Sequence, residues 1–160
     1  MATIKKRPEG LGQYGGFTPD GNLTTLRFTM ETNSTGAIIG SDSTSAPTRG
    51  DLVVLGTLPE GMVLEDATVI VSEVLTENMI GSLGFLYADG VDSDVTPQDE
   101  LYFGSAFHLD SDESRQRCTT ANYPVKLDKD AWLVMRIAGA ANAKAGRVDV
   151  IVHGERMGPK

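Results

Sequence analysis

Residues 131–155 read AWLVMRIAGAANAKAGRVDVIVHGE, and this stretch decides the fold. Each half alternates between two sets of side chains, and the apolar sets are Leu133, Met135 and Ile137 in the first half and Val148, Val150 and Val152 in the second. A period of two predicts two strands, each with one apolar face. The short connection of Gly, Ala, Asn and Lys residues favours an antiparallel hairpin. The apolar face of that hairpin must be covered by another sheet, so the stretch predicts a sandwich.

Further strands are predicted upstream of this stretch. Leu26, Phe28 and Met30 alternate with polar residues, as in a half-buried strand. The β-branched residues of 67–75 predict a central strand. Other apolar runs predict strands at 51–56, 82–89 and 101–109, and the sequence between them predicts a surface loop at 41–50, a turn at 58–62 and the longest polar connection at 110–130.

The chain therefore contains about eight predicted strands, with turn signals between them and no sustained helical periodicity. This pattern predicts an all-β fold, a single-domain two-sheet antiparallel sandwich that is jelly-roll-like and carries an extended N-terminal arm. An immunoglobulin-like sandwich is the competing architecture, because strand order cannot be read from one sequence. No internal repeat indicates a solenoid or a propeller.

Length and composition restrict the classes of partner. The chain has 160 residues, about the length of one domain. Its 14 basic and 22 acidic side chains give a net charge of −8, which argues against direct binding to nucleic acid or to an anionic membrane. Cys118 is the single cysteine, so an internal disulfide is impossible. Neither a membrane-spanning run nor a signal peptide is recognisable, so we expect folding in a cytoplasm.

Residues 1–22 differ from the rest of the sequence. They contain five glycines, and their first ten residues place Lys5, Lys6 and Arg7 against a single acidic residue, Glu9. We therefore divide the chain into a flexible basic Gly-rich arm at 1–22 and a β-sandwich domain at 23–160. The arm is either a frayed terminus or a segment that becomes ordered along an acidic partner. In the second case Lys5, Lys6 and Arg7 are the candidates for partner contact.

Motifs for nucleotides and metals are incomplete. Gly10, Gly12 and Gly15 fit the dinucleotide fingerprint, but no strand precedes them and no helix is predicted after them. The acidic loop 89–100 is the best candidate for binding a hard cation, although it lacks the EF-hand spacing, and a second acidic cluster follows at residues 110–113. A solvated loop explains both clusters more simply. We predict no cofactor and no metal.

Catalytic candidates are few and scattered. His108 and His153 lie on different predicted strands, without further ligands at zinc spacing. Cys118 follows two arginines and could be a reactive thiol, whereas Ser82 misses the nucleophile-elbow pattern of hydrolases. These residues form no recognisable triad, so we predict that the protein is not an enzyme and has no catalytic residues.

Four strings carry a resemblance to a known family, namely LRFTMETNSTG, GDLVVLGTLPEGMVLEDATVIVSEVL, GFLYADGVD followed by PQDELYF, and LDKDAWLVMRIAGAANAKAGRVDVIVHGE. Their strand and turn pattern resembles that of small structural proteins of tailed bacteriophages, the decoration or cement proteins of the head, which have jelly-roll folds. The resemblance covers residues 26–155 and not the arm. It implies a non-catalytic virion protein, made in the host cytoplasm, that binds the major capsid protein on the capsid exterior as a homodimer or homotrimer and stabilises the shell.

Other functions remain open at the level of sequence. A receptor-binding or carbohydrate-binding jelly-roll module of a fibre or tail is one, although such sites present exposed aromatic residues and this chain has one Trp and four Tyr. A head-completion protein is a second. A hydrolase that uses Cys118 or Ser82 is a third, and replacement of either residue by alanine would reveal it.

Overall fold

The computed structural model describes residues 2–5, 23–111 and 114–156. Within these ranges the chain forms strands and connecting loops, with no helix that could cross a membrane. The strands are β1 (Thr3–Lys5), β2 (Leu23–Thr32), β3 (Leu52–Leu58), β4 (Met62–Glu73), β5 (Met79–Tyr87), β6 (Asp99–His108), β7 (Ser114–Arg117), β8 (Val125–Lys126), β9 (Ala131–Gly139) and β10 (Gly146–Arg156).

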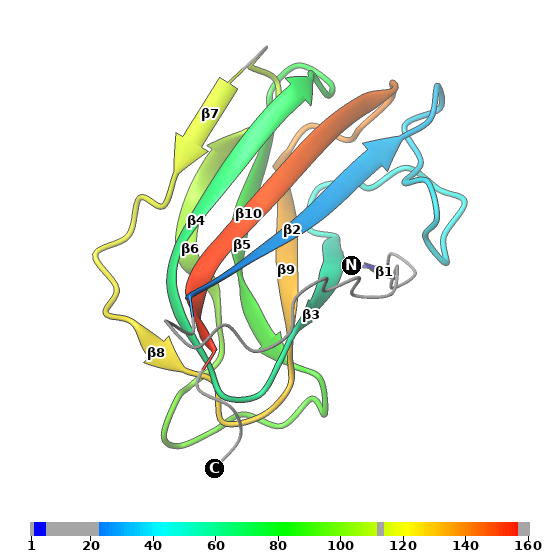
Figure 1. The fold of residues 1–160 in the computed structure, drawn as a ribbon. Coiled ribbons are helices and arrows are strands. Elements are labelled where there is room, and N and C mark those ends of the chain that lie inside the picture. Colours follow the sequence, from blue (N-terminus) through cyan, green and yellow to red (C-terminus); the bar gives the residue numbers. More distant parts are fainter. Residues whose placement is uncertain (1, 6–22, 112–113, 157–160) are drawn as a thin grey trace.

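These strands build two facing sheets (Figure 1). The β3 sheet has the order β1-β3-β9-β5-β6, and the β10 sheet has the order β2-β10-β4-β7, with β8 paired to β4. All neighbouring strands are antiparallel except β1 and β3, which are parallel. When β1 and β8 are set aside, the remaining eight strands follow the order of a jelly roll, in which all connections except that between β5 and β6 lead to the other sheet. The predicted all-β, jelly-roll-like sandwich is confirmed.

The hairpin predicted for residues 131–155 is wrong. Strand β9 pairs with β3 and β5, whereas β10 pairs with β2 and β4 in the other sheet. A period of two shows only that each strand has one buried face. Two successive strands show the same period when they belong to opposite sheets and both bury that face in the core, and β9 and β10 are arranged in this way.

The connection between β9 and β10 is fixed by Asn142, whose side chain is 3% exposed. Its amide nitrogen donates to the carbonyl oxygens of Gly36 (3.1 Å) and Lys144 (2.9 Å), and its Oδ1 accepts from the amide (3.3 Å) and hydroxyl (3.1 Å) of Thr76. Its own backbone amide donates to Pro47 O at 3.0 Å. One buried amide side chain therefore joins several loops at this end of the sandwich.

The core lies between the two sheets and takes one apolar face from each of the long strands. Leu133 and Met135 of the β3 sheet and Val148, Val150 and Val152 of the β10 sheet are fully buried. Burial of a side chain of this size contributes about 1.5–3 kcal/mol to stability. The alternation that identified these residues in the sequence therefore also identifies part of the core.

Two short strands occur where only a polar connection was predicted. Strands β7 and β8 both pair with the outer edge of β4, which places β4 inside its sheet, as predicted for residues 67–75. Neither short strand shows an apolar alternation, because β7 contains SRQR and β8 only VK. Between them, the chain passes Tyr102, whose hydroxyl lies 2.7 Å from Tyr123 O. Burial raises the pKa of Tyr102 to about 12.

Candidate interaction surface at the N-terminal edge

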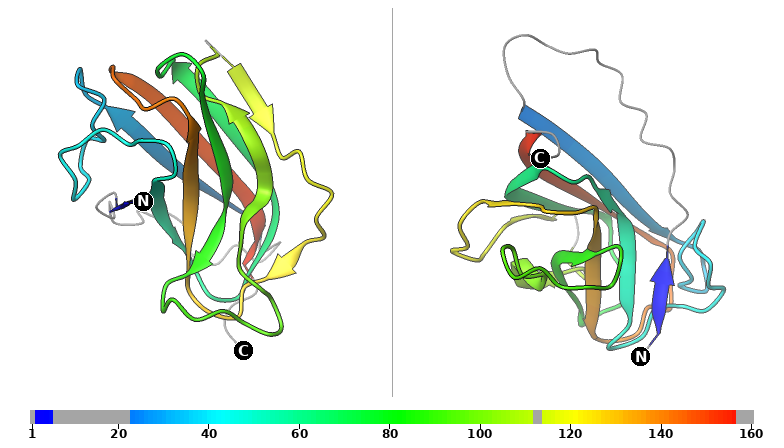
Figure 2. Two further views of the ribbon diagram at one scale, coloured as in Figure 1. Left: turned by 180° about the vertical axis from the view of Figure 1, so that it is seen from behind. Right: turned by 90° about the horizontal axis from the view of Figure 1, so that it is seen from below.

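Strand β1 lies along the free edge of β3 and is the first element of the β3 sheet (Figure 2). Its Ile4 side chain is 3% exposed and belongs to the main core, whereas Thr3 and Lys5 are exposed. The backbone of Ala2 extends the contact, because Leu52 N donates to Ala2 O at 3.0 Å. Part of the 1–22 segment thus packs on the body through a single buried side chain.

Asp51 holds the start of this strand. Its carboxylate accepts hydrogen bonds from the Ala2 amide at 2.8 Å and from the amide and hydroxyl of Thr48, both at 2.9 Å. Burial of Asp51 acts to raise the pKa of its carboxyl group, but these hydrogen bonds outweigh burial and lower the pKa below its ordinary value of 3.8. Asp51 is therefore a charged anchor for the backbone of residue 2.

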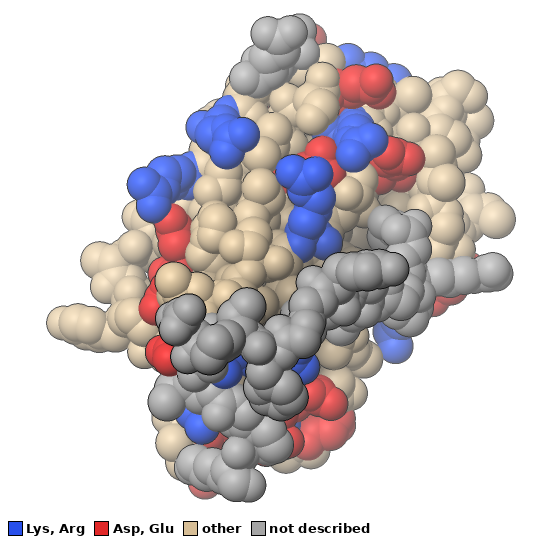
Figure 3. Space-filling model, viewed as in Figure 1, with Lys and Arg blue, Asp and Glu red and all other residues tan. Residues whose placement is uncertain are grey.

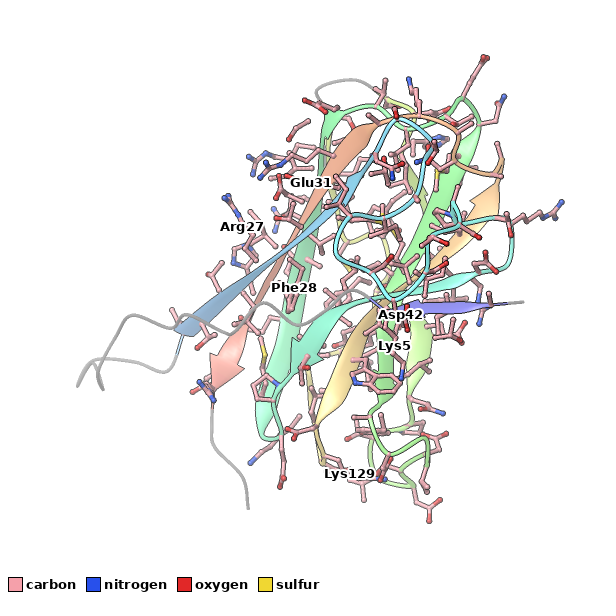
Figure 4. All side chains as sticks on the ribbon, turned by 90° about the vertical axis from the view of Figure 1, so that its right-hand side faces the viewer. Lys5, Arg27, Phe28, Glu31, Asp42 and Lys129 are labelled. Carbon is pink, nitrogen blue, oxygen red and sulfur yellow. The ribbon has the colours of Figure 1, made fainter. Side chains whose placement is uncertain are left out.

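The loop 41–50 lies against the other side of β1. Lys5 N donates to the Asp42 carboxylate, and Asp42 N donates to Lys5 O, both at 2.9 Å. Figure 4 shows Lys5 and Asp42 next to each other beside β1. Lys5 and the surface loop, recognised separately in the sequence, are in direct contact here.

The Lys5 ammonium group lies 4.4 Å from the centre of the Trp132 ring, which is within range of a cation–π interaction. Trp132 and Leu86 border a small apolar cluster of Leu52, Val54 and Val134 on the outer face of the β3 sheet. We call β1, loop 41–50, Asp51 and Trp132 the N-terminal edge. Lys6 and Arg7, the other two candidates for partner contact, lie outside the described residues, as do Gly10, Gly12 and Gly15.

The outer face of the β10 sheet carries interspersed charges of both signs, as Figure 3 shows. Arg147 contacts Glu31 (2.9 Å) and Asp149 (3.1 Å), and Arg117 pairs with Asp66. Arg27 is exposed on β2. Beside Arg147 and Glu31 the surface has a polar hollow of about 270 Å³. Several charges on this face are therefore paired within the chain.

The acidic loop 89–100 uses several of its carboxylates internally. Asp89 accepts a hydrogen bond from the Lys129 ammonium group at 2.8 Å, and this bond lowers the pKa of Asp89. Asp92 accepts from the backbone amides of Ser93 (2.8 Å) and Gln98 (2.7 Å). The described part of the chain contains no cluster of three or more potential metal ligands. Asp112 and Glu113 of the second acidic cluster lie outside that part.

The histidines lie in different sheets. His108 is on β6, with its Nδ1 3.7 Å from Asp110, whereas His153 is on β10 and its Nδ1 lies 3.3 Å from the Thr25 hydroxyl. They therefore do not form a common site within the described residues.

The candidate nucleophiles are likewise separate. Cys118 is half-buried against the core and lies 3.3 Å from the Thr120 hydroxyl, while the neighbouring Arg117 pairs with Asp66. Ser82 is buried on β5, and its hydroxyl has no hydrogen-bond partner in the described structure. Within the described ranges, no hydrogen bond joins either side chain to a histidine.

Comparison with solved structures identifies the architecture. One match is a chain in the "Capsid of Ralstonia phage GP4", with a TM-score of 0.65 and 15% identity over 98% of this chain and 99% of that one. Another is a chain in the "Cyanophage Pam1 capsid asymmetric unit", with a TM-score of 0.59 and 16% identity over 89% and 91% of the two chains. The fold is one found in phage capsids. No protein-family model matches the sequence, and no curated protein is significantly similar to it.

Proposed function

We propose that this chain is a structural protein of a phage virion that binds and stabilises the capsid shell as a decoration, or cement, protein. In this proposal its partner is the major capsid protein, its place is the capsid exterior, and it acts as a homodimer or homotrimer. The role requires no catalysis. It follows from binding the assembled shell more tightly than the free subunits, which shifts the equilibrium towards the shell.

The similarity to a chain in a phage capsid carries the proposal, because it extends over almost the full length of both chains. The fold alone is compatible with many functions, so the proposal also needs surfaces that suit binding to a shell. Two surfaces of this protein have suitable properties. The N-terminal edge presents a lysine beside a surface loop, and the outer face of the β10 sheet is broad and mixed in charge. Broad polar surfaces suit many weak contacts that add up on a lattice.

The direct test is binding of the purified protein to isolated shells that lack it. We expect it to sediment with assembled shells and not to bind free capsid subunits, which stay in the supernatant. It should also raise the temperature at which shells disassemble. The rise should increase with the concentration of added protein and then level off. Sedimentation with neither shells nor subunits, with no change in shell melting, would reject a role in the shell.

A charge-reversal variant tests the surface. Lys5→Glu places a carboxylate beside Asp42 and Trp132, so binding to shells should weaken if the N-terminal edge contacts an acidic partner. The matched control is Lys126→Glu on β8, which changes the net charge equally and lies at the outer edge of the other sheet. Equal weakening by both variants would indicate a general charge effect instead of contact at this edge.

A receptor-binding or carbohydrate-binding module of a fibre or tail is the second candidate, favoured by Tyr123, which is 87% exposed. Exposed aromatic side chains are typical of such sites. Binding to a glycan array that is lost in Tyr123→Ala would support this candidate. A head-completion protein is distinguished by copy number, because decoration covers the whole shell whereas head completion occupies one vertex.

A further inference from the structure

Strand β1 is held on the body by few contacts. Three residues pair with β3, and Ile4 supplies the buried side chain. Further contacts are hydrogen bonds that the backbone amides of Ala2 and Lys5 donate to the carboxylates of Asp51 and Asp42, with the Leu52 and Asp42 amides donating back to the carbonyl oxygens of residues 2 and 5, and the cation–π contact of Lys5. The pairing of β1 with β3 is also the one parallel pairing among the described strands. Because β1 lies at the edge of its sheet, removal of β1 would break no other strand pairing.

The site that receives β1 is built entirely by later parts of the chain. The backbone edge comes from β3, the anchoring carboxylates come from Asp42 and Asp51, and the indole ring comes from β9. An unoccupied β3 edge would expose unpaired backbone groups and the space filled by Ile4. None of these contacts depends on which copy of the protein supplies the strand.

The length of the connection permits exchange between copies. Seventeen residues, 6–22, separate Lys5 from Leu23. At about 3.3 Å per residue these can span up to about 56 Å. A domain of this size has a radius of gyration of only about 15 Å. A strand on such a connection can reach the β3 edge of a neighbouring molecule.

We propose that β1 of one copy docks on the β3 edge of a second copy, in the same parallel register that it has in the single chain. Exchange of an identical element preserves all contacts, so the free-energy difference between the two arrangements comes from the connecting segment alone. The tether gives β1 an effective concentration in the millimolar range at the β3 edge of its own chain, so the intramolecular arrangement dominates in dilute solution. Exchange becomes favourable where copies are packed together. This inference goes beyond the proposed shell binding and does not depend on it.

Two single-cysteine proteins can test the exchange directly. Thr3 and Leu52 are register partners, and neighbouring strands lie at a distance that a disulfide can span. Thr3→Cys and Leu52→Cys are made separately in a Cys118→Ala background, mixed in reduced form from micromolar to millimolar concentration, and then oxidised. The mixed dimer is identified by mass. The matched control replaces Leu52→Cys with Ser105→Cys, at an exposed position on β6 at the far edge of the same sheet.

We expect the yield of the Thr3–Leu52 mixed dimer to rise with concentration and to exceed the control by about tenfold near 1 mM. A yield equal to the control at every concentration would overturn the proposal. Lys5→Cys and Val54→Cys form a second register pair, which covers the case in which Leu52→Cys does not fold. In a second experiment the oxidation is repeated with shells present; if the cysteine at position 52 then links to a shell subunit and never to a second copy, the β3 edge receives the capsid protein and the proposal is wrong. Because the main experiment uses no shells, its outcome is independent of the shell-binding test.

Discussion

At the scale of single residues, Gly56 is fixed by its contact with Phe28. A Cβ atom at position 56 would lie 2.4 Å from Phe28 Cε1, at a bulge where the pairing of β3 with β9 shifts register. Phe28, labelled in Figure 4, comes from β2 of the opposite sheet and is buried. The close approach of the two sheets at this point therefore depends on the missing side chain.

Gly56→Ala should destabilise the protein by about 1–3 kcal/mol, the usual cost of overpacking a core. Urea unfolding would measure the change in the free energy of unfolding. A double-mutant cycle with Phe28→Leu provides the control, since a smaller side chain relieves the clash. Strictly additive effects of the two substitutions would show that the clash is not the cause.

Asp51 gives the stability a dependence on pH. Because the pKa of its carboxyl group is lower in the folded protein than its ordinary value of 3.8, the carboxylate stabilises the fold above that value. This contribution is lost as the pH falls through the folded pKa. Asp51→Asn should therefore cost about 1.5–3 kcal/mol at pH 7, the range for hydrogen bonds to a charged group.

Urea unfolding at a series of pH values checks this expectation. The difference between wild type and Asp51→Asn should shrink progressively below pH 3.8. Asp94→Asn, at an exposed loop position, is the control and should change stability little at any pH. A difference for Asp51→Asn that stays constant down to strongly acidic pH would contradict the proposed anchoring.

At the scale of elements, docking of β1 can be followed separately from the rest of the fold. Ile4→Asp would place an unpaired carboxylate in the core, so β1 should leave the β3 edge. Lys5 would then move away from Trp132, the single tryptophan. We expect the fluorescence of Trp132 to shift to longer wavelength while the far-ultraviolet circular dichroism stays unchanged.

Thr3→Asp is the matched control, because Thr3 is exposed on the same strand and the same charge is introduced. It should leave the emission of Trp132 unaltered. Loss of the circular-dichroism signal in Ile4→Asp would mean that β1 is required for the whole fold, which would contradict the independent docking of this strand.

Strands with one apolar face were readable from the sequence because alternation reports burial directly. The pairing partner of each strand could not be read from the sequence, because β9 and β10 would show the same alternation as neighbours in one sheet or as members of opposite sheets. Strands β7 and β8 escaped detection because they are short edge strands without an apolar alternation, paired to β4 through the backbone. Of the N-terminal edge, the sequence indicated Lys5 and the loop 41–50 separately. Their contact links residues 37 positions apart and required the fold.

At the scale of the whole molecule, β10 occupies the centre of its sheet, with β2 on one side and β4 on the other. Its residues Val148, Val150 and Val152 are fully buried. At about 1.5–3 kcal/mol each, their burial is comparable with the total stability of a typical domain, about 5–15 kcal/mol. A protein that ends at Ala145 should therefore fail to fold.

Far-ultraviolet circular dichroism and urea titration would test this truncation. We expect an unfolded spectrum without a cooperative transition. Removal of residues 1–5 is the comparison, and it should leave a folded protein because β1 lies at the edge of its sheet. A cooperative transition in the shortened protein would show that β2 and β4 can form a stable sheet without β10.

The central position of β10 also affects biosynthesis. The ribosome makes β2 and β4 long before the strand that must lie between them, so the nascent chain holds an incomplete sheet until residue 156 has emerged. Products of premature termination would lack the middle of that sheet. Such fragments would be targets for proteolysis, so only chains that contain β10 would enter an assembly.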